Sequence, residues 1–296
     1  MSSAKSFKQV DVFSQTKFKG NPVAVFYDAD DLTDSEMQQI ARWTNLAETT
    51  FVLKPTTREA SYRLRIFTVL GELPFAGHPT LGSCYALIEL GLIQPNSAGL
   101  FVQECAAGLV EIKPIGSLTD LRNLELQFKL PYYRFEYLVD QTTQMSEIAK
   151  LLGVSHEKII TEPVLVDDGP RWLVVQLDDN ESVIGLKPDF SYMVELSHKY
   201  NWSGISAFGK DQSSETEFEL RNFCPGDLLE EDAACGSGAG SVGAYLGAHL
   251  KSGHTKLKLS QGRCIGRDAT LNVSIENGGT DVFVRGAATT CIVGTY

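Results

Sequence analysis

Polar and apolar residues alternate along two stretches of the chain that have similar sequences. Residues 62–68 read YRLRIFT and residues 218–224 read FELRNFC. A period of two in hydrophobicity predicts a half-buried β-strand. The stretches lie 218 − 62 = 156 residues apart and share Leu, Arg and Phe at matching positions. The pattern therefore predicts one kind of strand, used twice.

A glycine-rich loop and an apolar run follow each of these strands. The first loop is FAGHP at 75–79, continued by TLGSCYALIELG, and the second is ACGSG at 234–238, continued by AGSVGAYLGAHL. The segment 81–90 carries one charge, Glu89, and the segment 239–250 carries none. A helix that is apolar on most sides is buried. Each run is therefore predicted to be a helix inside the fold.

Further strand-like segments begin at Val102 and Leu259, so both copies have the order strand, loop, buried helix, strands. We predict an α+β fold with two pseudo-symmetric halves. Each half is expected to be a curved, mostly antiparallel sheet or barrel around a central apolar helix, with the glycines of the second helix allowing strands to approach closely. The predicted halves are 1–117, completed by 284–296, and 118–283, with the active site in the cleft between them.

Other elements have local signals. The sequence TDSE is a capping box that begins a helix at 34–44. Apolar residues at helical spacing predict another helix through Leu152, ended by Gly153. Residues 10–13 and 23–26 are predicted to be strands joined by a GNP turn.

Composition excludes several classes of function. The 296 residues include 26 basic and 37 acidic side chains, a net charge of 26 − 37 = −11. We therefore expect no nucleic-acid partner, which requires a basic surface, and no anionic membrane. No stretch approaches the ~18 apolar residues of a membrane helix. The N-terminal sequence lacks the apolar core of a signal peptide, and the six cysteines form no C-x-x-C motif. We expect a reduced, cytoplasmic protein without a metal site.

The starts of the two buried helices are candidate anion sites. Gly77-His78-Pro79 stands at the first start and Gly236-Ser237-Gly238 at the second. A helix N-terminus offers unpaired backbone N–H groups and the positive end of the helix dipole. Each loop alone could be only a tight turn, but two loops in matching positions favour a site for a small carboxylate.

Three titratable residues are candidates for acid–base chemistry. His78 is distinguished from the other four histidines by its place at a helix start. Glu48 stands between an apolar helix end and a predicted strand, where desolvation would make its carboxylate a stronger base. Its local sequence is equally compatible with a cap or an exposed loop residue. Asp232 precedes the second helix, as either a cap or a site residue.

Two other motifs are interpreted as structural. Cys235 could be reactive at a helix N-terminus, but the matching residue of the first copy is Ala76, so a two-thiol racemase is not predicted and Cys235 is assigned to packing. The G-x-G-x-x-G sequence at 238–243 follows an acidic loop, and Arg263 stands where a dinucleotide fingerprint requires an acid. No nucleotide cofactor is therefore expected.

The sequence resembles the PhzF-like isomerase family along nearly the whole chain, and is most similar to its uncharacterised fungal members. The segments that carry the resemblance are DVF at 11–13, GNPVAV at 20–25, NLAETTFV at 45–52, LRIFT at 64–68, ELPFAGHPTLG at 72–82 and EDAACGSG at 231–238. The resemblance implies a diaminopimelate-epimerase-like fold, catalysis without metal or organic cofactor, and a homodimer.

The resemblance also implies roles for individual residues. Glu48, His78 and Asp232 match the family's catalytic positions, and Gly77 and Ser237 match its substrate contacts. The family's usual EDPATGSA appears here as EDAACGSG. The function expected is an acid–base isomerase that shifts a proton within a small carboxylate-bearing metabolite. The alternatives are a binding or scaffold protein that keeps the cleft without the reaction, and a nucleotide-dependent oxidoreductase.

Overall fold

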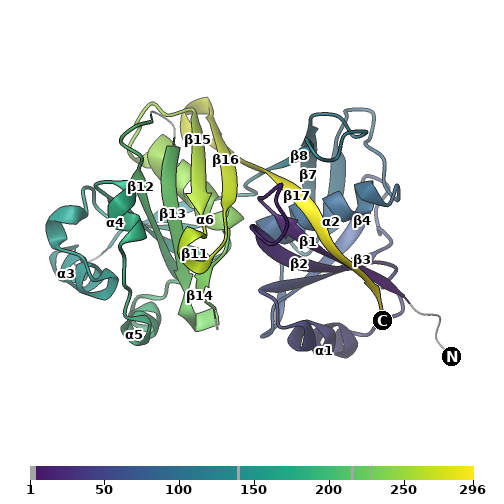
Figure 1. The fold of residues 1–296 in the computed structure, drawn as a ribbon, viewed down its shortest axis with the longest axis horizontal. Helices are drawn as coiled ribbons and strands as arrows, with labels where there is room; N and C mark the ends of the chain where they lie inside the picture. Colours follow the sequence, from purple (N-terminus) through teal and green to yellow (C-terminus); the bar gives the residue numbers. More distant parts are fainter. Residues whose placement is uncertain (1–4, 139–140, 215–216, 228) are drawn as a thin grey trace. The chain divides into compact units, whose positions relative to one another are not determined.

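A computed structural model describes residues 5–138, 141–214, 217–227 and 229–296. The chain divides into two compact units (Figure 1). The first unit is Met1–Lys129 with Arg285–Tyr296, and the second is Leu130–Val284. Strand β8 pairs with β7 of the first unit, which places residues 118–129 there, beyond the boundary predicted at 117.

The first unit is an eight-stranded barrel around a central helix. Neighbouring strands are antiparallel at β1–β2, β3–β4, β6–β7 and β7–β8 and parallel at β2–β3 and β4–β6. The last strand of the chain pairs with both β1 and β8 and closes the ring. The elements are β1 (Ser6–Val12), β2 (Asn21–Phe26), α1 (Asp34–Thr44), β3 (Glu48–Leu53), β4 (Tyr62–Phe67), β5 (Glu72–Leu73), α2 (Gly77–Glu89), β6 (Phe101–Cys105), β7 (Gly108–Ile115), β8 (Glu125–Lys129) and β17 (Asp281–Thr295).

The second unit has the same order of strands around helix α6. Strands β10 and β11 are antiparallel, β11 and β12 parallel, β12 and β13 antiparallel, β13 and β15 parallel, and β15 and β16 antiparallel. Its elements are β9 (Arg134–Glu136), α3 (Gln141–Leu152), β10 (Val164–Asp167), β11 (Arg171–Leu177), α4 (Asn180–Ile184), α5 (Phe190–Tyr200), β12 (Gly204–Lys210), β13 (Glu217–Cys224), β14 (Leu229–Asp232), α6 (Gly236–Ala244), a π-helical turn (Tyr245–His249), β15 (Lys256–Gln261) and β16 (Ala269–Glu276). Single 3₁₀ turns lie at His156–Lys158, Pro225–Asp227, Arg263–Ile265 and Asn277–Gly279.

An ion pair recurs at the same place in both units. Arg65 on β4 donates through Nε and a terminal nitrogen to the two carboxylate oxygens of Glu72 on β5, at 2.8 and 2.6 Å. Arg221 on β13 makes the same fork with Glu231 on β14, at 3.0 and 2.6 Å. The offset between the arginines is 221 − 65 = 156, as in the sequence. The predicted α+β fold with two pseudo-symmetric halves is confirmed.

Close strand packing explains the small residues of the central helices. Every residue of α2 from Gly77 to Leu87 is buried. A Cβ on Gly82 would lie 2.5 Å from Val23 Cγ1, and one on Gly243 of α6 would lie 2.6 Å from Val273 Cγ1. Side chains there would force the strands away from the helix, so glycine is required in spite of its low helix propensity.

The two helices with local signals form as predicted, but the predicted GNP turn is wrong: Asn21 and Pro22 already pair with Val12 and Asp11 as part of β2, and residues 13–20 connect the two strands. Helix α1 spans Asp34–Thr44, and Thr33 and Glu36 make the reciprocal bonds of a capping box. Helix α3 ends at Leu152 and is followed by Gly153 with φ of +70°. Within the described ranges, the helices are too short or too polar to cross a membrane.

Candidate functional site

Glu48 and His78 form the strongest candidate centre. Glu48 is the first residue of β3, and His78 lies in the first turn of α2. Glu48 Oε2 and His78 Nε2 are 3.3 Å apart, while the two side chains are only 16% and 5% exposed. The sequence-predicted acid and histidine of the first unit are therefore neighbours, at a distance that allows proton transfer with a small adjustment.

The surroundings of His78 keep its imidazole neutral. Nδ1 lies 3.4 Å from Asn21 Nδ2. Burial lowers the pKa of His78 to about 3, against the opposing effect of a hydrogen bond to the Pro22 carbonyl. A neutral imidazole has one nitrogen that donates and one that accepts. Near neutral pH the ring is therefore uncharged and can form one hydrogen bond as a donor and one as an acceptor.

The low pKa of His78 has a consequence for stability. Between about pH 3 and 6.5 the unfolded chain protonates this imidazole and the folded chain does not, so acidification lowers the free energy of unfolding. From pH 6.5 to 5.0 this amounts to about 2 kcal/mol. We expect His78→Asn to reduce by about that amount the stability difference between pH 7.5 and 5.0, measured by urea unfolding. The same substitution at the exposed His156 is the control, and an unchanged pH dependence in His78→Asn would contradict the assignment.

The start of α2 has no side-chain cap. Its N-cap is Ala76 in extended conformation, which makes no side-chain hydrogen bond to the helix. Pro79 lies in the first turn, where its missing N–H costs least. The first backbone N–H groups of α2, around Gly77, thus have no side-chain acceptor from the N-cap residue.

The start of α6 is built differently. Cys235 is the N-cap, and its Sγ accepts a hydrogen bond from Gly238 N at 3.3 Å. Ser237 Oγ accepts from Trp172 Nε1 at 2.9 Å. Burial, and then the charge of nearby Asp232, raise the pKa of Cys235 well above its usual range. The cysteine is therefore a protonated thiol that caps the helix.

Asp232 and the glycines of this loop are held by close contacts. Asp232 is the last residue of β14 and is paired in register with Asn222. It is not the helix cap, since Cys235 has that position. A Cβ on Gly238 would lie 2.0 Å from Asn222 Nδ2. Gly236 is the first residue of α6 and is buried. The sequence-predicted residues of the second unit thus gather at one helix start.

The position of the second unit that corresponds to Glu48 carries no carboxylate. Thr49 pairs with Phe67, and Ile205 pairs with Phe223, which is the residue matching Phe67. Glu48 therefore corresponds to Gly204. A Cβ on Gly204 would lie 2.2 Å from the Phe223 carbonyl oxygen and 2.7 Å from the Trp172 ring. The second unit therefore has no acid that matches Glu48, because there is no room for a side chain at this position.

Sequence reasoning missed three polar residues that support these loops. Asn21 was part of a predicted turn, Trp172 had no signal, and Gln261 appeared only as a strand residue. Gln261 donates to the Asp232 carbonyl at 2.9 Å and accepts from Cys235 N at 3.0 Å. Of these three residues, only Asn21 lay in a sequence motif, the GNP segment, that could have drawn attention to it.

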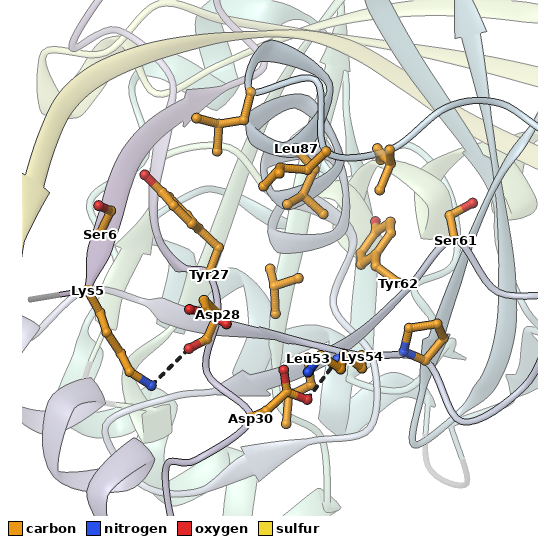
Figure 2. Close-up of a pocket in the computed structure, with 15 residues that line it drawn as sticks. Lys5, Ser6, Tyr27, Asp28, Asp30, Leu53, Lys54, Ser61, Tyr62 and Leu87 are labelled. Atoms are coloured by element: carbon orange, nitrogen blue, oxygen red, sulfur yellow. Dashed lines mark hydrogen bonds between the residues drawn. The ribbon is translucent and has the colours of Figure 1, made fainter. Parts of the chain in front are cut away.

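A separate cavity of about 560 Å³ lies in the first unit (Figure 2). Its lining includes Tyr27, Tyr62 and Leu87, with Lys5 at its edge bonded to the Asp28 carbonyl at 2.9 Å. Leu87 lies nine residues after His78 on α2, about 13 Å along the helix axis. The candidate catalytic residues are not among its lining residues, so this cavity is distinct from the Glu48–His78 centre.

Comparisons with known proteins identify the family. Residues 10–294 match the PhzC-PhzF family, described as "Phenazine biosynthesis-like protein". The chain is 47% identical over 295 residues to Antisense-enhancing sequence 1 of Schizosaccharomyces pombe, covering 98% of this chain and 97% of the relative. It is 32% identical over 275 residues to trans-2,3-dihydro-3-hydroxyanthranilate isomerase of Pseudomonas aeruginosa, covering 92% and 91%.

Solved structures agree with the fold. A PhzF-family protein of Bacillus anthracis superimposes with a TM-score of 0.85 at 22% identity, covering 99% of both chains. A hydroxyproline epimerase of Agrobacterium vitis superimposes with a TM-score of 0.67 at 12% identity, covering 99% of this chain and 92% of the other. The resemblance predicted from the sequence is confirmed: the chain belongs to the PhzC-PhzF family of phenazine biosynthesis-like proteins and is an isomerase.

Proposed function

We propose that this isomerase shifts a proton within a small carboxylate-bearing metabolite by acid–base chemistry, without a cofactor. The observation that carries the proposal is the buried pair of Glu48 and His78, whose Oε2 and Nε2 atoms are 3.3 Å apart. A carboxylate and a neutral imidazole in contact can remove a proton from one atom of a substrate and return it to another.

In this mechanism Glu48 takes a proton from a carbon next to an unsaturated or carbonyl-like centre. The electron pair of the broken C–H bond shifts into the adjacent system, and a proton is then returned at a different atom. His78 and Asp232 orient the substrate and assist the return. The double bond or tautomer changes position, and no atom is gained or lost, as an isomerisation requires.

The asymmetry between the two halves supports acid–base chemistry on one side of the substrate. Ala76 and Cys235 occupy matching helix caps, so a pair of thiols is not available there. Gly204 stands where the first unit has Glu48, and Ser237 stands where it has His78. A racemase with two equivalent bases would need matching acid–base groups in both halves. We assign proton removal to the first unit and substrate binding to Ser237 and its neighbours.

The helix starts are proposed to bind the carboxylate and stabilise negative charge during the reaction. Gly77, Gly236 and Ser237 supply backbone N–H groups and a hydroxyl, while Gly238, whose N–H donates to Cys235 Sγ, fixes the turn that presents them. Groups of this kind, fixed before the substrate arrives, commonly contribute a few kcal/mol (about 3) to the stabilisation of a developing anion. Only part of the barrier is then left to Glu48.

Solvent deuterium incorporation tests the proposal. The first compound to use is trans-2,3-dihydro-3-hydroxyanthranilate, after the name of the Pseudomonas aeruginosa relative, followed by a panel of small unsaturated and 2-oxo carboxylates. The wild-type chain in D₂O is expected to incorporate deuterium into at least one of them. Binding in a thermal-shift assay without incorporation into any compound would instead favour the binding-protein alternative.

We also propose a homodimer, as the family resemblance implied. Light scattering coupled to size exclusion should give twice the 32.5 kDa of the chain. A mass of one chain across the concentration range of the assay would overturn this assignment and leave the proposed chemistry unaffected.

A further inference from the structure

Gln261 bonds both ends of the loop that leads into α6. It is the last residue of β15 and is 1% exposed. Its Nε2 donates to the carbonyl oxygen of Asp232 at 2.9 Å, and its Oε1 accepts from the backbone N–H of Cys235 at 3.0 Å. One buried amide group therefore satisfies a backbone acceptor at the start of the loop and a backbone donor at its end.

The residue after Gln261 packs against the same loop. Gly262 has φ of +91°, a conformation that L side chains rarely adopt. A Cβ on Gly262 would lie 2.6 Å from the carbonyl oxygen of Ala233, in the middle of the loop. The end of β15 thus touches the loop at its beginning, middle and end.

We propose that Gln261 is a positioning residue of the active site, which sets the backbone of residues 232–235 and through it the direction of Asp232 and the first turn of α6. The effect of Gln261 on the reaction rests on the proposed function, whereas its effect on the loop backbone rests on the hydrogen bonds alone. Cys235 caps α6 by accepting from Gly238 N, and its Sγ lies 3.4 Å from Ser237 Oγ. A shift of the Cys235 backbone would therefore move the groups assigned to substrate binding.

The chemistry of a glutamine explains why this residue type is needed. The Asp232 carbonyl requires a donor and the Cys235 N–H requires an acceptor. A side-chain amide offers both at once, whereas an ionised carboxylate offers acceptors only. A protonated carboxylic acid again has one donor and one acceptor. Gln261→Glu should therefore hold the loop in acidic solution and release it in alkaline solution.

The experiment compares Gln261→Glu and Gln261→Met with the wild-type chain. Backbone hydrogen exchange of residues 233–238, measured by mass spectrometry, is expected to be at least tenfold faster than wild type at pH 8 in both variants. At pH 5.5 Gln261→Glu should return to within about threefold of wild type, and Gln261→Met should not, because methionine has neither group. The ratio to wild type at each pH removes the intrinsic pH dependence of exchange.

The catalytic meaning is tested with the same proteins. Deuterium incorporation into trans-2,3-dihydro-3-hydroxyanthranilate, or into whichever carboxylate the wild type accepts, should fall at least tenfold in Gln261→Glu at pH 8 and recover at pH 5.5 relative to wild type. Gln38→Glu is the matched control, since Gln38 Nε2 also donates to a loop carbonyl, that of Thr68 at 2.9 Å, in the first unit. Its incorporation rate should stay within twofold of wild type.

Each failure has a distinct meaning. Wild-type hydrogen exchange at 233–238 in both variants would overturn the positioning role. Faster loop exchange with unchanged deuterium incorporation would show that Gln261 serves stability alone, and would also overturn it. If the wild type itself incorporates no deuterium, the proposed function fails, while the hydrogen-exchange result still decides whether Gln261 holds the loop. If Gln261→Glu does not fold, Gln261→Met decides both arms at pH 8.

Discussion

Replacing Glu48 by glutamine is expected to slow substrate deuterium incorporation by about a thousandfold, within the 10²–10⁴ range typical of a general base. Glutamine keeps the size of the side chain and its capacity for hydrogen bonds, but it does not accept a proton at neutral pH. The binding groups at the two helix starts remain in place. We therefore expect the affinity for a carboxylate ligand to change little while the chemical step is lost.

The measurement is the initial rate of deuterium incorporation at saturating substrate, with the folded fraction checked by thermal unfolding. Glu111→Gln is the control, because Glu111 is exposed on β7 of the same unit. It should leave the rate unchanged. A Glu48→Gln rate within tenfold of wild type would remove Glu48 from the role of base and would shift attention to Asp232.

Replacing Arg221 by methionine is expected to lower the free energy of unfolding by about 3–5 kcal/mol. The guanidinium and its partner Glu231 have side chains that are only 8% and 6% exposed. Arg221 also donates to the carbonyl oxygens of Val183 and Leu186 at the end of α4, at 3.2 and 3.0 Å. Removing the arginine leaves a buried carboxylate and buried carbonyls without their donor.

The duplicated ion pair provides the control for this prediction. Arg65 makes the same bonds with Glu72, but the Glu72 side chain is 35% exposed. In Arg65→Met, water can therefore donate some of the hydrogen bonds that the Glu72 carboxylate loses. Arg65→Met should cost about 1 kcal/mol. Urea unfolding of the two variants gives the comparison. Equal losses of unfolding free energy in the two variants would mean that burial does not set the strength of this ion pair. Replacing Arg221 and Glu231 together by Met should recover much of the stability that Arg221→Met loses.

The duplication was visible in the sequence because it repeats features that are local. The alternating strand with its central arginine, the glycine-rich loop and the apolar helix each have a signal within about fifteen residues. The two strands match at an offset of 156 in the sequence. The matching pairs of Arg65 with Glu72 and Arg221 with Glu231 then follow from the same strand and hairpin in both units.

The candidate centre depended on information that is not local. Glu48 and His78 are thirty residues apart, and no spacing rule brings the start of a strand next to the start of a helix. Family resemblance supplied that pairing. Gln261 and Trp172 had no such support, because their contacts with Cys235 and Ser237 depend on strand register across the second unit. The boundary after Lys129 differs from the predicted one for the same reason: only the pairing of β8 with β7 assigns β8 to the first unit, and no local signal in the sequence predicts that pairing.

The path of strand β17 has a consequence for the order of folding. In the first barrel, β17 pairs with β8 on one side and with β1 on the other. Along the chain, however, the whole second unit, Leu130–Val284, separates β8 from Arg285–Tyr296, the part of the chain that completes the barrel. Closing a flexible loop of that length carries an entropic cost that grows with its logarithm. Within the second unit, Leu130 N donates to the Val282 carbonyl at 2.9 Å, so its own folding brings the two ends of the insertion together. If the second unit folds first, it therefore holds β17 close to β8, and the first barrel can then close. Mutations in the second unit that slow its folding should therefore also slow the folding of the first unit.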